Sequence, residues 1–520
     1  MSLRLLRPEL AQDAYAREID AALPQVLALP DRDPLSATRG YGDRQFWAWK
    51  LIDFPNGTLQ GAVNGLSALL SADAFAAHVS KDAVEDRIGE MQAATLRMMR
   101  RDGSFEEALP YEQSYCVTAL VAYDHLCATE RLGGSLPNAK PLERAIRFLI
   151  RRDETHGFIS NHLATAVAAL RRWDRLAGDA AARRKADLLL ERILAGQSEE
   201  GWFVEYGGAD PGYQTLCMTH LADAAETAGD ERLWAALEKG VGFVSHFVHP
   251  DGSFGGVYGS RATRIYYPAA MELLAARSPL AARIAARMKR AIGEATTVPL
   301  AAIDQPNLMP LFNNCCQALL AAAGRTDAED WGLSPGRRLL AEAGLLVDAG
   351  ERHHTIVSTR KGGVIYHWRD GALVLADAGI ALRDGGRVLT SQGDDPDNVI
   401  EVAGDEIRIS GRLRPLAIPL PNAFNFLVLR LLGATAMRLP AVNALVKRAI
   451  AGMLVRAGKK SAGGFKRRIT LGPHLRVDDE WQPSTLERIP TPTPFSAIHM
   501  ASAGYWQMGD DAAAPARNRK

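Results

Sequence analysis

The side chains best suited to chemistry gather in two stretches of the chain. Ser160-Asn161-His162 places an amide beside an imidazole where a helix is expected to begin. The later stretch EEGWFVEYGGADPGYQT includes the acids Glu205 and Asp210 and the phenols Tyr206 and Tyr213. Imidazole and phenol groups can transfer protons, and an amide can hydrogen-bond a carboxylate. Together these stretches could carry acid–base chemistry on an acidic substrate.

Glycine-containing turns divide the first two thirds of the chain into repeats that would position these groups. The turn glycines are Gly57, Gly103, Gly157, Gly201 and Gly252, at gaps of 46, 54, 44 and 51 residues, and a glycine-free copy follows at 305–314. Each turn leads into an apolar helix, and amphipathic segments such as 140–152 and 182–196 lie between. We therefore expect an α/α toroid of about six helical hairpins over residues 1–350, with the turns on one rim.

The composition changes near Thr355, where short alternating runs begin. These runs are separated by Gly, Asp and Asn turns, which is typical of antiparallel sheets. We expect a β-sandwich over residues 351–505, interrupted by a helical insert at 422–458, and a disordered tail at 506–520. The predicted fold class is therefore multidomain α+β, a toroid followed by a sandwich.

On these features the chain resembles the heparinase II/III-like polysaccharide lyases, including their alginate-lyase relatives. The residues that carry the resemblance are the Asn161-His162 pair and the Glu200-Gly201 turn, followed by Glu205 and Tyr213. The resemblance implies β-elimination on a uronate-containing glycan. Asn161 would then neutralise the substrate carboxylate, and His162 and Tyr213 would move protons. The family often adds a histidine from the sandwich, for which we favour His354 over His353 and His367.

Further residues are candidates for contact with an acidic polysaccharide or oligosaccharide. Their side chains are polar or aromatic and their expected places are on the rim or the inner helices: Glu205, Tyr115, Arg261, Arg264, Tyr266 and Asn313. An arginine can bind a carboxylate through two hydrogen bonds. Equally, the aromatic residues could fill a core and the arginines could be solvated rim charges. No cofactor and no metal are expected.

Other functions fit parts of the pattern. A uronate C5-epimerase would share the proton abstraction, and a glycoside hydrolase would need two inward carboxylates, for which Glu106, Glu107, Glu112, Glu205 and Asp210 are candidates. A non-catalytic glycan-binding or assembly protein would keep the toroid but lack its chemistry. The DGSFGG turn at 251–256 also resembles terpene-cyclase toroids, but the D-x-D-D acid motif of one cyclase class is absent from the sequence.

Net charge and cysteine content limit the classes of partner and the cellular compartment that we expect. The formal net charge is +1, which gives no global attraction for nucleic acid, and the five cysteines are expected to be reduced. The first residues lack the apolar core of a signal peptide, so we expect a cytoplasmic protein. Residues 407–477 contain fourteen Lys or Arg and no acid. Segment 422–468 is therefore expected to contact an anionic inner membrane peripherally or to receive an acidic polymer, unless it is an ordinary packed hairpin.

Overall fold

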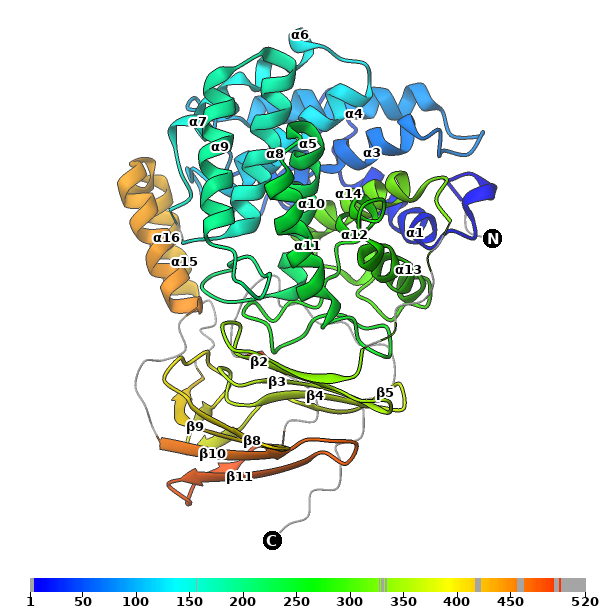
Figure 1. The fold of residues 1–520 in the computed structure, drawn as a ribbon. Coiled ribbons are helices and arrows are strands. Elements are labelled where there is room, and N and C mark those ends of the chain that lie inside the picture. The colour runs from blue at the N-terminus through cyan, green and yellow to red at the C-terminus, as the bar shows by residue number, and fades with distance from the viewer. Residues whose placement is uncertain are drawn as a thin grey trace.

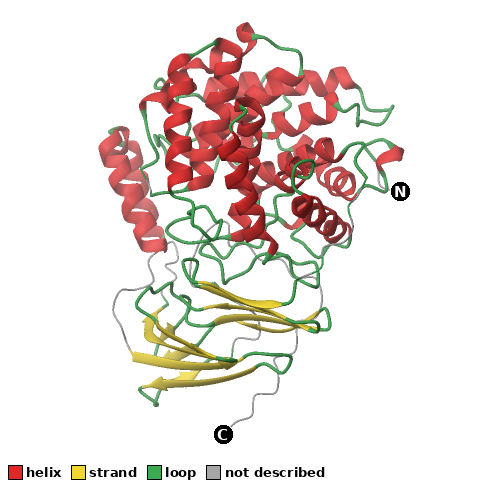
Figure 2. Cartoon of the chain, in the orientation of Figure 1, coloured by secondary structure: helices red, strands yellow, loops and turns green. Residues whose placement is uncertain are grey.

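The computed structural model describes residues 4–155, 157–326, 328, 332, 334–416, 422–455, 463–490 and 495–496. Helices form the N-terminal part of the molecule, and the antiparallel sheets form the C-terminal part below it (Figures 1 and 2). The predicted toroid-plus-sandwich architecture is confirmed.

The helical part is a closed double ring. In the described part of the chain, six inner helices each contact the next, and the last contacts the first: α3 (Ala62–Ser71), α5 (Tyr115–Arg131), α8 (Ser160–Ala177), α10 (Pro211–Ala228), α12 (Ala269–Leu274) and α14 (Gln305–Ala322). The outer helices are α1 (Ala14–Ala28), α4 (Lys81–Met98), α7 (Glu143–Arg151), α9 (Ala180–Ala195), α11 (Glu231–Ser245) and α13 (Pro279–Gly293). Short helices α2 (Arg44–Trp47) and α6 (Leu136–Ala139) lie in connections.

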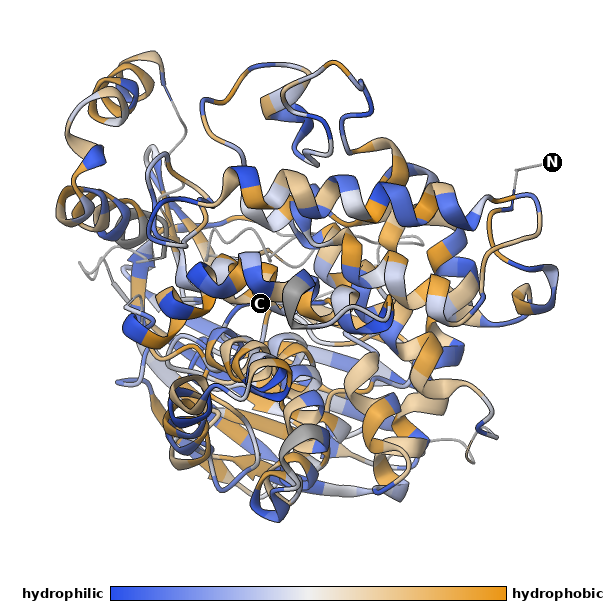
Figure 3. Ribbon diagram, turned by 90° about the horizontal axis from the view of Figure 1, so that it is seen from above, coloured by the Kyte–Doolittle hydropathy of each residue, from blue (hydrophilic) through white to orange (hydrophobic). Residues whose placement is uncertain are grey.

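Burial explains why the two sets of helices differ in composition. In inner helix α8 every residue from Leu163 to Leu170 is buried, whereas outer helix α9 buries one face through residues such as Ala186 and Leu190. An outer helix therefore needs hydrophobic and hydrophilic residues side by side, a mixture visible around the ring (Figure 3).

The turn glycines hold the rim against the outer helices. Gly103 and Gly201 have φ angles of +93° and +95°, which favour glycine. A Cβ on Gly201 would lie 2.2 Å from the carbonyl oxygen of Lys239 in α11. At these two of the five turns, the glycine therefore permits a close approach to the backbone of an outer helix.

Two antiparallel sheets form the sandwich. The first has the order β1 (Gly336–Leu340), β2 (Leu345–Ala349), β3 (His353–Ser358), β4 (Val364–Arg369) and β5 (Ala372–Asp377). The second has the order β11-β10-β9-β7-β6-β12, with β8 also paired to β9. Its strands are β6 (Ala381–Asp384), β7 (Arg387–Thr390), β8 (Val399–Ala403), β9 (Glu406–Pro415), β10 (Gly463–Thr470), β11 (Arg476–Gln482) and β12 (Glu487–Arg488).

The first sheet begins earlier than the boundary at residue 350 expected from the sequence. Strands β1 and β2 precede that boundary. They were not expected because their Leu-rich sequence, RRLLAEAGLLVDA, resembles that of the toroid helices and lacks a period-two pattern. The proposed tail, 506–520, lies outside the described residues.

Alternate residues of the first sheet join two different cores. Leu346, Val357 and Ile365 pack with residues of the second sheet, such as Ile407 and Ile409. Their neighbours Val347, Ile356 and Val364 belong to the core of the toroid. The first sheet is therefore covered on both faces and joins the toroid to the rest of the sandwich.

The helical insert is a hairpin of α15 (Ala423–Ala434) and α16 (Pro440–Val455), beside the toroid (Figure 1). Among the described helices, none combines the length and the apolar character needed to cross a bilayer.

Candidate functional site

His162 forms a pair with a carboxylate that the sequence analysis did not single out. Its Nδ1 lies 2.8 Å from Oε2 of Glu154, in the turn before α8. The Glu154 side chain is 1% exposed and that of His162 is 16% exposed. A carboxylate at one ring nitrogen orients the imidazole and leaves Nε2 for a substrate. The pair is therefore suited to general acid–base chemistry.

Asn161 is held from behind by Glu205. The Asn161 backbone N–H donates to Oε1 of Glu205 at 2.9 Å, and Nδ2 donates to Oε2 at 2.8 Å. Burial raises the pKa of Glu205 to about 7, although Arg261 and the two hydrogen bonds oppose the shift. Glu205 is fully buried, so it positions Asn161 and offers no surface to a substrate, contrary to the sequence-based expectation.

Arg261 lies between two tyrosine rings at the start of α10. Its guanidinium carbon is 4.3 Å from the ring centres of both Tyr206 and Tyr213. Its Nη2 donates to the Tyr213 hydroxyl at 3.4 Å. Such a cation beside a phenol can stabilise negative charge that develops on the oxygen.

Asp210 fixes this arrangement. Its Oδ1 accepts from Tyr213 N at 3.1 Å and so caps α10, while Oδ2 accepts from Arg261 N at 3.0 Å and Thr263 N at 3.3 Å. Burial raises the pKa of Asp210, and these hydrogen bonds oppose the shift. The loop that carries Arg261 is thereby tied to the helix that carries Tyr213.

These groups form one assembly at the N-termini of α8 and α10, which we call the rim cluster: Glu154, Asn161, His162, Glu205, Tyr206, Tyr213 and Arg261. The two halves are linked because Glu205 bridges to Ile159 at the start of α8 and its carbonyl accepts from Ser260 Oγ at 3.0 Å, beside Arg261. The cluster contains two groups that can move protons, an amide and a cation.

The loop that carries Arg261, from Val257 to Arg264, connects the rim cluster to the sandwich. Arg264, expected to bind substrate, donates through Nη2 to the Tyr366 hydroxyl of β4 at 3.0 Å. Lys361, from the turn between β3 and β4, donates to the carbonyl oxygens of Val257 and Gly259, the latter at 2.9 Å. The sandwich thus supports the loop from below.

The structure places His354 away from the rim cluster. It is fully buried, with its ring centre 6.4 Å from that of His249 and 5.5 Å from that of Trp368. Burial lowers its pKa to about 3. His354 therefore fills the interface between sandwich and toroid, because β3 turns the face of Ile356 and His354 towards the ring.

Three other substrate candidates are core residues. Tyr115 and Tyr266 are each 3% exposed, and Tyr266 packs its ring edge-on against Phe254. Asn313 donates to Gly61 O and accepts from Gly65 N, both at 2.9 Å, and so braces α14 against α3. Residue type alone did not distinguish an aromatic or amide group in the core from one that faces a substrate.

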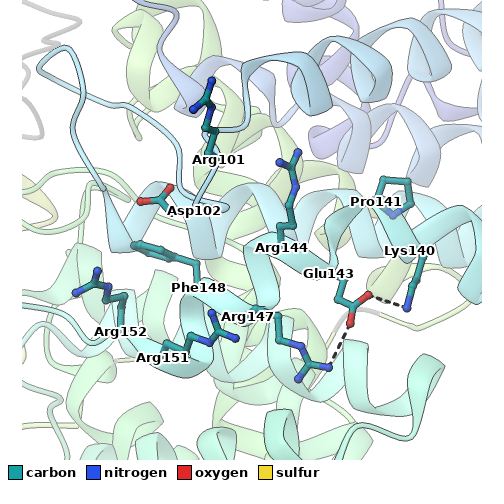
Figure 4. Close-up of a pocket in the computed structure, with 10 residues that line it drawn as sticks. All are labelled: Arg101, Asp102, Lys140, Pro141, Glu143, Arg144, Arg147, Phe148, Arg151 and Arg152. Atoms are coloured by element: carbon teal, nitrogen blue, oxygen red, sulfur yellow. Dashed lines mark hydrogen bonds and ion pairs between the residues drawn. The ribbon is translucent and has the colours of Figure 1, made fainter. Parts of the chain in front are cut away.

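A basic groove of about 540 Å³ lies beside α7 (Figure 4). Its lining is Arg101, Asp102, Lys140, Pro141, Glu143, Arg144, Arg147, Phe148, Arg151 and Arg152, six cationic residues against two acids. Glu143 pairs with Lys140 and Arg147 at 2.7 and 3.3 Å. Arg152, one of the lining residues, lies two positions before Glu154 of the rim cluster in the sequence.

Comparison with known proteins places the fold. No protein-family profile and no curated protein matches the sequence. Among solved structures, a Paenibacillus xanthan lyase is similar at 10% identity and a TM-score of 0.50, over 89% of this chain and 45% of that one. Chondroitin AC lyase of Streptomyces coelicolor aligns at 14% identity and TM-score 0.46, over 78% of this chain and 66% of its own. Heparinase III aligns at 9% identity and a TM-score of 0.47, over 92% of this chain and 78% of its own.

The chain thus spans 66% of the chondroitin lyase and 45% of the xanthan lyase. Identity this low relates the proteins by fold alone. The ring, the two sheets and the likeness to the xanthan lyase together confirm what the sequence led us to expect: this chain has the toroid-plus-sandwich fold of the heparinase-like polysaccharide lyases.

Proposed function

We propose that the protein is a polysaccharide lyase that cleaves an acidic, uronate-containing glycan by β-elimination. The observation that carries the proposal is the rim cluster, where the Glu154–His162 pair lies beside Asn161 and near the Tyr213–Arg261 pair. Solved structures similar to this chain include a xanthan lyase, a chondroitin AC lyase and heparinase III.

The cluster supplies the parts that elimination needs. A base removes the proton from C5 of the uronate, the C4–O4 bond breaks, a C4=C5 double bond forms, and O4 takes up a proton. In our proposal the neutral His162 takes the C5 proton at Nε2, and Tyr213 gives its proton to O4. Arg261 then stabilises the phenolate, and the second N–H of Asn161 Nδ2 binds the C6 carboxylate as charge develops on it.

The basic groove supports an acidic substrate. Six cations against two acids favour a polyanion, and the lining residue Arg152 is two positions before Glu154 in the chain. We propose that an acidic chain bound at the rim cluster extends along this groove.

The test is turnover of a panel of uronate-containing glycans, followed by the near-ultraviolet absorbance of the unsaturated product. We expect His162→Ala and Tyr213→Phe to lower kcat/KM at least ~100-fold, because each removes a proton-transfer group. Glu154→Gln should cost about tenfold or more, and should change the pH profile, since the amide no longer orients a protonated imidazole. His78→Ala, at an exposed site, is the matched control and should leave turnover unchanged.

Two outcomes would replace elimination with another chemistry. New reducing ends without the absorbance would indicate hydrolysis. Exchange of the C5 hydrogen with solvent without cleavage would indicate an epimerase, which would use the same proton-transfer groups.

A further inference from the structure

The α15–α16 hairpin turns an apolar stripe towards solvent. Phe424, Leu427, Val428 and Leu431 follow the i, i+3, i+4, i+7 spacing of one helix face, and they are between 39% and 72% exposed. Within α15 Gly433 is the one buried residue described. An amphipathic helix of a globular protein normally buries such a stripe against its core. The hairpin therefore presents a surface built to be covered by something outside the chain.

The hairpin is fastened to the toroid by its other side. Asn443 Nδ2 donates to the carbonyl of Pro110 at 2.7 Å, Lys447 pairs with Glu112, and Arg430 Nη2 donates to the carbonyl of Leu51 at 2.9 Å. These contacts fix the hairpin beside the ring, where it stands apart from the other helices (Figure 1). The stripe is thus part of an attached element whose α15 is exposed over most of its surface, Phe426 included.

The apolar surface continues onto the toroid loop that Arg430 contacts. Trp49 and Leu51 in that loop are 67% and 61% exposed. On α16 and the turn before it, Leu439 and Leu445 are also exposed. Tryptophan is a residue favoured at the boundary between water and lipid.

The charge of the hairpin indicates which kind of partner covers its apolar surface. Residues 422–455 include four basic side chains, Arg430, Arg438, Lys447 and Arg448, and no acid. Arg438 and Arg448 are exposed beside the apolar residues. Arg430 is partly neutralised, because its Nη1 lies 3.7 Å from Oδ1 of Asp53 in the loop. Two such hairpins face to face would bring like charges together, so an anionic surface fits better than a second copy.

We propose that the hairpin and the 49–51 loop dock this protein onto an anionic lipid bilayer, with α15 and α16 lying in the plane of the interface. With 12 and 16 residues, the helices are too short to span a bilayer, so their apolar residues enter only the outer acyl region. The exposed Arg438 and Arg448 meet the phosphate groups. This proposal does not depend on the proposed enzyme activity.

The test is co-sedimentation of the full chain with vesicles of phosphatidylcholine, with and without phosphatidylglycerol, at low salt and at about 1 M salt. We expect binding to the anionic vesicles that weakens at high salt. The variant Phe424→Ser/Leu427→Ser/Leu431→Ser should lower the partition coefficient at least ~10-fold. Arg438→Gln/Arg448→Gln should lower it about fivefold per residue at low salt. Leu188→Ser, at an exposed leucine of outer helix α9, is the matched control and should bind as the natural chain does.

A second measurement guards against misfolded variants. Brominated lipids should quench fluorescence of the natural chain, and Trp49→Phe should remove that part of the quenching. No binding at low salt, binding unchanged by the triple Ser variant, or a lipid-free dimer that the triple variant dissociates would each overturn the proposal.

Discussion

Glu205 shows how a single buried acid shapes the rim cluster. It satisfies both the backbone and the side-chain amide of Asn161 while remaining out of contact with water. Its folded pKa of about 7 lies above the ordinary value of 4.5. Between these pH values the folded chain keeps a proton that the unfolded chain has lost, so the free energy of unfolding falls as pH rises through this window, by about 3 kcal/mol.

Glu205→Gln should remove that dependence. We expect the difference in free energy of unfolding between the natural chain and the variant, from urea titrations, to change by about 3 kcal/mol between pH 4.5 and pH 7.5. Glu199→Gln, at an 86% exposed carboxylate, is the control and should show a difference that barely varies with pH. A constant difference for Glu205→Gln as well would contradict the assigned burial of its charge.

Residue identity predicted part of this site. Asn161, His162 and Tyr213 could be singled out because they open inner helices at equivalent points of the repeat. Glu154 could not, because its contact with His162 depends on how the turn 153–159 folds back, although its place in the DETHGFIS turn was a usable signal. His354 was misplaced because a strand exposes alternate residues to different faces, and the sequence does not say which face meets the ring.

The glycine turns are the elements that set the rim. Gly201→Ala should strain a φ of +95° and drive a Cβ into the Lys239 carbonyl, at 2.2 Å in the present geometry. We expect a loss of about 3 kcal/mol or more in the free energy of unfolding. Gly178→Ala is the matched control, since Gly178 has a φ of +64° with no atom within 4 Å of the added Cβ, and should cost only about 1 kcal/mol. Equal losses would mean that the close approach to α11 contributes nothing.

Some helices and strands could be predicted from the sequence and others could not. The repeat spacing predicted the ring because one turn recurs with each helical hairpin, and at Gly103 and Gly201 that turn lies against the backbone of an outer helix. Strand β2 was missed because a strand buried on both faces loses its alternation, and the largely exposed β1 was missed because its sequence GRRLL has no period-two pattern. The helical insert at 422–458 was expected from the sequence, but which of its residues pack on the toroid was not, since that depends on contacts such as Asn443 with Pro110.

At the scale of the whole molecule, the toroid and sandwich share one core and a set of polar fasteners. Val347 and Ile356 of the first sheet pack with toroid residues. Trp368 Nε1 donates to Asp251 Oδ2 at 2.8 Å across the joint. Lys361 of the sandwich donates to the carbonyl oxygens of Val257 and Gly259, in the loop that also carries Arg261. The geometry of the rim cluster therefore depends on the sandwich being in place.

Lys361 makes this joint sensitive to alkaline pH. Burial lowers its folded pKa to about 8, from an ordinary 10.5. Between those values the unfolded chain holds a proton that the folded chain lacks, so the free energy of unfolding rises with pH across the window, by about 3 kcal/mol. Lys361→Met removes the titrating group but leaves the Val257 and Gly259 carbonyls without their donor. The advantage of the natural chain over Lys361→Met should therefore grow from pH 7.5 to pH 10.5 in denaturant titrations. Lys239→Met, at an exposed lysine of α11, controls for general effects of high pH, and an advantage that stays flat for Lys361 would show that its amine is hydrated in the folded protein.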